Sequence, residues 1–148
     1  MDKSKNLAKV TLVAEIIFMV MLSVSFLIMP FANKMSLNEG KNTLLYFSGA
    51  MFWASLVFEA VFLIANGAIC KKRIMPENKS RPGALRFFTN TTAKIIDILA
   101  ILSIIGFVIC AFLTDKYVTY GFLSAMLLLV QLHCVVNGKN FEYINSLS

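Results

Sequence analysis

Four long apolar runs dominate this chain and limit what it can fold into. They cover about residues 7–31, 42–69, 89–113 and 117–136. Each run is long enough to cross a bilayer as a helix, since a helix rises about 1.5 Å per residue and the hydrocarbon core is about 30 Å thick. None of the runs alternates apolar and polar residues, the pattern typical of a transmembrane β-strand. The sequence therefore predicts an all-α integral membrane protein with four transmembrane helices.

The connections between the runs predict how the helices are arranged. Pro30 lies at the end of the first run, and a proline suits a helix end better than a helix interior. The connections at about 32–41 and 114–116 are short, and short connections join antiparallel neighbours. We therefore expect an up-down-up-down four-helix bundle made of two antiparallel hairpins. The chain has 148 residues, of which 58% are hydrophobic and 15% charged, which fits a single membrane domain over 1–148.

The distribution of Lys and Arg predicts the orientation. Of the 14 basic residues, only Lys34, Lys41 and Lys116 flank the two short connections. The others lie at the opposite helix ends, most of them before the first run and in the loop at about 70–88. Under the positive-inside rule, this bias places both termini and the loop in the cytoplasm, and the helices in the cell membrane.

The basic loop, residues 71–88, has two interpretations. Ser80, ahead of Arg81 and Pro82, is suited to cap a short helix, with Phe87 and Phe88 at the membrane interface. In that case its positive charge would attract anionic lipid or a partner protein. The simpler interpretation is that the loop only determines the topology. The net charge of +6 does not indicate nucleic acid, because no exposed basic domain with stacking aromatic residues carries it.

Well inside each apolar run lies one acid or histidine: Glu15, Glu59, Asp97 or His133. A charged side chain at the bilayer centre costs at least about 2.5 kcal/mol, so a functional role is the default hypothesis. Structural alternatives exist for three of them. Glu15 could reach the headgroups, Asp97 could pair with Lys94 one turn earlier, and His133 could hydrogen-bond a neighbouring carbonyl. Glu59 lies deepest and has no basic neighbour on its own helix.

A polar stripe runs along the second run. Ser48, Ser55, Glu59 and Asn66 follow one another at intervals of seven, four and seven, which returns to one helical face. In lipid such a stripe must face protein or water. We therefore expect Glu59 to be buried at a helix interface or an aqueous cavity, within reach of another polar side chain. The candidate intramembrane polar site comprises Glu59, Glu15, Asp97, Asn66, Ser55 and His133.

Two further patterns concern how the helices pack. Gln131 and His133 lie about 200° apart on the fourth run, so they cannot both face one narrow core. Small residues three and four apart let helices approach closely, within the bundle or between protomers. The helix-packing candidates are Ala50, Ala54, Ser103 and Gly106, with Cys110 on the same face as the last two.

The motifs of enzymes and metal proteins are missing from the sequence. It has no HExxH, no ExxH and no second histidine, so we assign neither a metal site nor a cofactor. His133 and Cys134 are adjacent and therefore point apart on a helix, so we assign no catalytic residue. The three cysteines include no CxxC pair, which favours free thiols.

Three function classes remain after these exclusions. The first is a small multi-pass membrane protein that acts through helix–helix contacts, as an accessory subunit or an immunity-type protein. It would work in the bilayer as a homo-oligomer or in a larger membrane complex. The alternative is an oligomeric small transporter or channel that uses Glu59 as a proton or cation site. An integral-membrane enzyme is the third class, and the sequence motifs support it least.

Overall fold

The computed structural model describes residues 3–74, 83–113 and 116–145. This part of the chain is all-helical. In order, the elements are α1 (Lys3–Glu39), α2 (Thr43–Ile74), the 3₁₀ helix η1 (Gly83–Leu85), α3 (Thr91–Leu113), α4 (Lys116–Val136) and α5 (Lys139–Asn145). The helices α1, α2, α3 and α4 are long and apolar enough to cross a membrane. The prediction of four helices of spanning length is therefore confirmed.

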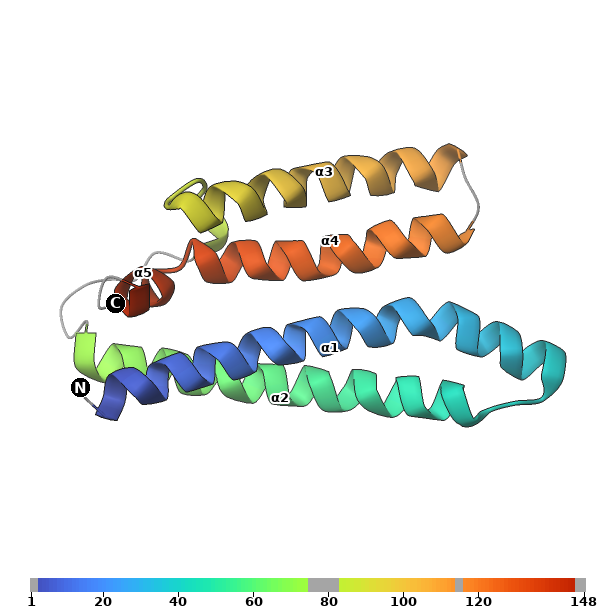
Figure 1. Cartoon of the computed structure of the whole chain (residues 1–148), viewed down its shortest axis with the longest axis horizontal. Coiled ribbons are helices and arrows are strands. Elements are labelled where there is room, and N and C mark those ends of the chain that lie inside the picture. The colour runs from blue at the N-terminus through green and yellow to red at the C-terminus, as the bar shows by residue number, and fades with distance from the viewer. Residues whose placement is uncertain (1–2, 75–82, 114–115, 146–148) are drawn as a thin grey trace.

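The four long helices lie side by side with alternating directions (Figure 1). α1 packs against α2, and α3 packs against α4. α1 also contacts α4, and this contact joins the two hairpins. The two ends of the chain lie at the same end of the assembly, next to the short helix α5 (Figure 1).

α1 is longer than the sequence predicts. It continues to Glu39, and Pro30 lies inside it, so the prediction that the helix ends at this proline is wrong. A proline removes one backbone hydrogen bond from a helix. Packing beyond the proline compensates for this loss, because Ala32 is completely buried and the ring of Phe31 stacks on Tyr117 with 4.8 Å between centroids. Tertiary contacts thus hold the last turns of α1 in place.

A glycine ends α1 instead. Gly40 has a φ of 67°, the left-handed conformation that glycine adopts without a steric cost. Its N–H donates to the carbonyl of Ser36 at 3.0 Å, which caps the C-terminus of the helix. The Ser36 hydroxyl also donates to the side-chain oxygen of Asn42, just before α2 begins. These contacts make the turn between the first two helices.

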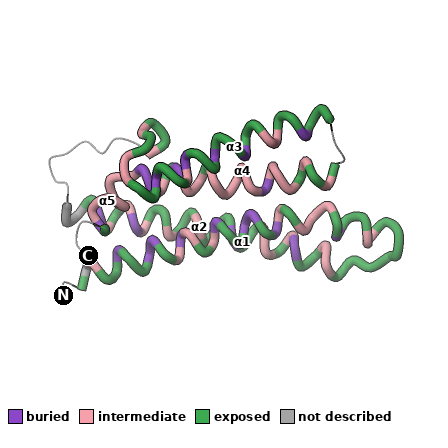
Figure 2. The backbone as a smooth tube through the Cα atoms, turned by 45° about the horizontal axis from the view of Figure 1, so that its top comes forward, coloured by how far each residue is buried: buried purple, intermediate pink, exposed green. Residues whose placement is uncertain are grey.

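The buried positions, which Figure 2 marks in purple, are mostly small or polar residues. Buried positions lie along the inner faces of the helices, whereas large apolar residues such as Trp53 and Ile105 are exposed. Among the aromatic contacts, Phe18 of α1 stacks on Phe58 and Phe62 of α2 at 5.1 and 5.6 Å. Small and polar interfaces suit helix packing in lipid, where apolar surface gains nothing by turning inward.

The end of the assembly near the two chain ends is closed by η1 and α5. A Cβ added to Gly83 would lie 2.0 Å from the carbonyl oxygen of Cys134, so η1 contacts the backbone of α4 directly. Arg86, just after η1, forms an ion pair with Glu142 of α5. Ser80, the predicted cap of a short helix in this loop, lies outside the described residues, and the helical segment described after it is η1.

Candidate functional site

The crossing of α1 and α4 is fixed by a reciprocal pair of serines. The Ser23 hydroxyl donates to the carbonyl oxygen of Ser124 at 2.6 Å, and the Ser124 hydroxyl donates to that of Ser23 at 2.7 Å. Both serines are buried. Since a hydroxyl on Cβ reaches the opposite backbone directly, the two helices must lie very close together at this point. This contact positions α4 against the hairpin of α1 and α2.

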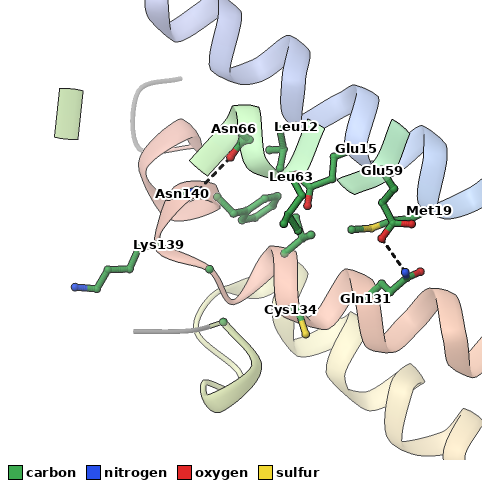
Figure 3. A pocket seen from close by; sticks show the side chains of 14 residues that line it. Leu12, Glu15, Met19, Glu59, Leu63, Asn66, Gln131, Cys134, Lys139 and Asn140 are labelled. Atoms are coloured by element: carbon green, nitrogen blue, oxygen red, sulfur yellow. Dashed lines mark hydrogen bonds between the residues drawn. The ribbon is translucent and has the colours of Figure 1, made fainter. Parts of the chain in front are cut away.

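Glu59 faces α4 from the polar stripe of α2. One carboxylate oxygen, Oε1, accepts a hydrogen bond from Nε2 of Gln131 at 2.8 Å (Figure 3). This is the kind of contact expected for Glu59, a polar side chain from another helix. The other carboxylate oxygen of Glu59 and Oε1 of Gln131 are also buried, and neither has a hydrogen-bond partner in the part of the chain that the structure describes.

Glu15 lies on α1 beside this pair. Its side chain is only 4% exposed, and its carboxylate points into the same space as that of Glu59 (Figure 3). Among the residues described, no hydrogen bond reaches the Glu15 carboxylate. Two acids from neighbouring helices therefore face one space, and both leave acceptor oxygens unpaired.

These side chains line a cavity of about 320 Å³ between α1, α2, α4 and the residues that close the end of the assembly. We call it the acidic cavity. Apart from the acids and amides, its wall is mostly apolar. It is lined by Leu12, Glu15, Met19, Glu59, Leu63, Asn66, Gly83, Gln131, Cys134, Val135, Gly138, Lys139, Asn140 and Phe141. The side chain of Lys139 points away from the two acids (Figure 3).

Asn66 joins three helices at the end of this cavity that lies nearest to α5. Its Nδ2 donates to the carbonyl oxygen of Ala8 at 3.0 Å and lies 3.1 Å from the Thr11 hydroxyl, both on α1. Its Oδ1 accepts a hydrogen bond from Asn140 of α5 at 3.1 Å (Figure 3). With both ends of its amide engaged, Asn66 acts as a structural link between α1, α2 and α5.

Asp97 and His133 are both buried and form a separate network between α3 and α4. Asp97 Oδ1 lies 2.7 Å from Nδ1 of His133 and accepts a hydrogen bond from Asn137 at 2.8 Å. Its Oδ2 accepts the backbone N–H of Phe88 at 2.7 Å. The Oδ1 of Asn137 in turn accepts from the Thr89 hydroxyl at 2.9 Å. The network thus attaches the segment before α3 to the end of α4.

The two polar groups therefore do not form one site. Gln131 points to Glu59, whereas His133 points to Asp97, in keeping with their separation around α4. The local pair of Asp97 with Lys94 that the sequence suggests is replaced by the pair with His133 across the hairpin. Asp97 and His133 have partners within the protein, but the acids of the cavity leave oxygens without partners among the described residues.

The remaining candidates pack the helices. Ser103 is buried, and a Cβ on Gly106 would lie 2.3 Å from the ring of Phe122, so this face of α3 fits closely against α4. By contrast, Ala50 and Ala54 are exposed on α2.

Ser55 is buried but takes no part in either polar group. It lies on the stripe of α2, is only 1% exposed, and its hydroxyl has no hydrogen-bond partner in the part of the chain described. It does not line the acidic cavity. Ser55 therefore belongs to the helix interface by position, without a polar contact of its own.

Four residues of these sites are not singled out by the sequence pattern. Gln131 and Ser124 share one face of the fourth run without a marked role, Asn137 suits a helix end, and Ser23 belongs to no pattern at all. The signal that points to Gln131 is its amide within an apolar run, a position where a polar group needs a partner.

The chemistry of the acidic cavity follows from its donors and acceptors. Glu15, Glu59 and Gln131 line it, and each carries an oxygen acceptor that has no hydrogen-bond partner among the described residues. Within the residues that the structure describes, no three His, Cys, Asp or Glu side chains gather closely enough to hold a metal ion. Cys134 on the wall is a free thiol. The arrangement is suited to bind a proton or a positively charged donor between the two acids.

Comparison of the chain with protein-family models, with curated proteins and with solved structures found no match.

Proposed function

We propose that this chain is a multi-pass membrane protein that binds a proton or a cation in the acidic cavity, as a small transporter or channel. The observation that carries the proposal is the pair of acids, Glu15 and Glu59, which face one space within membrane-spanning helices. Of the function classes considered, transport uses this feature directly, and a role in helix contacts alone does not require it.

The energetics of the cavity support binding of positive charge. Two ionised carboxylates in a space with mostly apolar walls repel each other, and each has lost its hydration. Among the described residues, the hydrogen bond from Gln131 satisfies only one of the four carboxylate oxygens. A bound proton or cation removes the repulsion and supplies the missing partner. The favourable free energy of binding therefore comes from relieving the repulsion and the lost hydration of the two carboxylates, which are already present in the folded protein.

The location of the cavity suggests the side from which it is loaded. It lies toward the end of the assembly where the two ends of the chain meet, near η1 and α5 (Figure 1). The excess of Lys and Arg favours a cytoplasmic position for this end in the cell membrane. The four long helices of one chain enclose little volume for a path through the full bilayer, so we include a homo-oligomer in the proposal.

The test is a flux assay with purified protein in liposomes. We expect the wild-type protein to carry protons, Na⁺ or K⁺ down an imposed gradient, and Glu59→Gln and Glu15→Gln to abolish this flux. Glu39→Gln is the matched control, because it makes the same chemical change at an exposed residue that pairs with Lys41 in the turn after α1. Flux that persists in Glu59→Gln, or no flux of any of the three ions, would overturn the proposal.

A second candidate is an accessory or immunity-type protein that works through helix contacts. The observation that favours it is the exposed position of Ala50 and Ala54 on α2, since small residues allow a second helix to approach closely. Replacing both alanines by leucine would then abolish cross-linking to a neighbouring chain in native membranes and leave the acidic cavity intact. For the basic loop, anionic lipid is the partner that we propose.

A further inference from the structure

The acidic cavity has one property that an inorganic ion does not explain. Most of its wall is apolar, formed by Leu12, Met19, Leu63, Val135 and Phe141. A cation such as Ca²⁺ takes six to eight oxygen ligands, and Mg²⁺ retains several waters. An apolar wall solvates neither the ion nor its waters. It is instead typical of sites for small organic molecules, which combine apolar walls with a few placed polar groups.

The polar groups match one kind of organic cation. A primary ammonium has three N–H donors and no acceptor. Three residues of its lining carry acceptor oxygens without a hydrogen-bond partner among the described residues: Glu15 with its carboxylate, Glu59 with its second carboxylate oxygen and Gln131 with Oε1. Glu15 is more than nine-tenths buried and points into the cavity without a hydrogen-bond partner in the described chain, which marks a ligand position independently of Glu59.

The size of the cavity limits the ligand further. A volume of about 320 Å³ is at the lower end of the range for small-molecule sites, about 300 to 1,000 Å³, and corresponds to roughly ten water-sized groups. We propose that the acidic cavity binds a small amphipathic primary amine in its ammonium form. The three oxygen acceptors hold the ammonium, and the apolar wall packs against the organic part. This inference rests on the proposed cation site and narrows its ligand.

The binding experiment uses the purified full-length protein and 2-phenylethylamine as the probe. Cys134 is one of the residues that line the cavity and is exposed, whereas Cys70 and Cys110 are buried, so the rate at which N-ethylmaleimide alkylates Cys134 serves as the readout without a substitution. We expect the amine to slow this alkylation in the wild-type protein, by about tenfold at ten times its dissociation constant. The amine should bind about 10- to 100-fold more weakly to Glu59→Gln and Glu15→Gln, because each change removes a charge-assisted hydrogen bond.

Three controls test whether binding requires the positive charge, the N–H donors and the acids of the cavity. Phenylethanol has the same apolar group without the charge, trimethylated phenylethylamine has the charge without the N–H donors, and Glu39→Gln changes an acid outside the cavity. We expect weak protection by the first two compounds and wild-type protection by the amine in the Glu39→Gln protein. Protection by phenylethanol or by the trimethylated amine that equals that of the primary amine overturns the proposed ligand.

The alkylation and flux results together distinguish failure of the proposed amine ligand from failure of the proposed cation transport, on which the ligand rests. If flux of protons or inorganic cations depends on Glu59 but the amine protects Cys134 in no variant, the ammonium ligand is wrong and the cation site stands. If the amine protects Cys134 equally in the wild-type protein and Glu59→Gln, the acids do not hold the ammonium. That result overturns the proposed ligand whatever the flux assay shows.

Discussion

Replacing Asp97 by alanine removes the acceptor at the centre of the α3–α4 network. Asp97 is only 1% exposed and accepts hydrogen bonds from the Phe88 backbone and from Asn137, and its Oδ1 lies 2.7 Å from His133 Nδ1. The substitution leaves these polar groups buried without their partner. It also releases the segment that the network attaches to the end of α4.

The magnitude follows from the number and kind of hydrogen bonds that the substitution removes. Polar interactions within membrane proteins average about 0.6 kcal/mol each, whereas leaving a buried polar partner unsatisfied costs about 1–3 kcal/mol for each group. Phe88 has a φ of 56°, and relief of this strained backbone returns about 1 kcal/mol. We expect Asp97→Ala to lower the free energy of unfolding by about 3 kcal/mol. Asp97→Asn, which keeps the oxygen near His133 but turns its amide to the Phe88 N–H, should cost about half as much.

The assay is reversible unfolding in mixed micelles with increasing sodium dodecyl sulfate, followed by circular dichroism. The matched control is Lys94→Ala, on the same helix, where the side chain is exposed. We expect a change below about 0.5 kcal/mol for this control. A decrease in the unfolding free energy below about 1 kcal/mol for Asp97→Ala, or equal decreases for Asp97→Ala and Lys94→Ala, would refute the claim that the network around Asp97 stabilises the protein.

Two further contacts between helices give predictions of their own. In a protein whose native cysteines are replaced by serine, the double substitution Ser23→Cys and Ser124→Cys should form a disulfide under mild oxidation, because the two hydroxyl oxygens lie 2.9 Å apart. Absence of this cross-link on non-reducing gels would contradict the α1–α4 crossing. Gly106→Ala should lower the unfolding free energy by about 1–3 kcal/mol through a clash with the Phe122 ring, and Gly121→Ala, where nothing lies within 4 Å, should not; equal effects in the same assay would argue against the close α3–α4 packing.

The number and positions of the long helices could be predicted because hydropathy and length are local properties. The end of α1 could not. Pro30 indicates a helix end by its own chemistry, but the burial of Ala32 and the stacking of Phe31 depend on the fold. Gly40 and its bond to Ser36 determine the actual end, and the sequence shows them only as a glycine after a serine-containing segment.

The partners of the polar residues depend on the fold in the same way. The stripe on α2 indicates which face of the helix carries Glu59, but not that Gln131 lies opposite it. For Asp97 the sequence offers a neighbour one turn away, whereas the hairpin supplies His133 as the partner. The contact made by Ser23 could not be predicted for a geometric reason. α1 contacts both α2 and α4, so its buried residues occupy more than one face.

The contrast between Asp97 and Glu59 leads to the last prediction. Both acids lie in helices that are long and apolar enough to cross a membrane, but Asp97 has partners for both oxygens, whereas Glu59 has a partner for only one among the described residues. Glu59→Gln removes a charge that repels Glu15 and retains a side-chain oxygen for the bond from Gln131. We therefore expect its unfolding free energy to stay within about 0.5 kcal/mol of the wild-type value or to rise, in the same detergent titration.

This measurement distinguishes a structural role from a ligand-binding role. Replacing a residue that stabilises the fold lowers the unfolding free energy of the protein, whereas replacing a ligand-binding residue does not. Asp97→Asn should unfold more easily, and the amine should still protect its Cys134, since the Asp97 network lies apart from the cavity. Glu59→Gln should keep its stability and lose that protection. If Glu59→Gln instead costs about 2 kcal/mol or more, the carboxylate holds the helices together, and the acidic cavity is a consequence of packing.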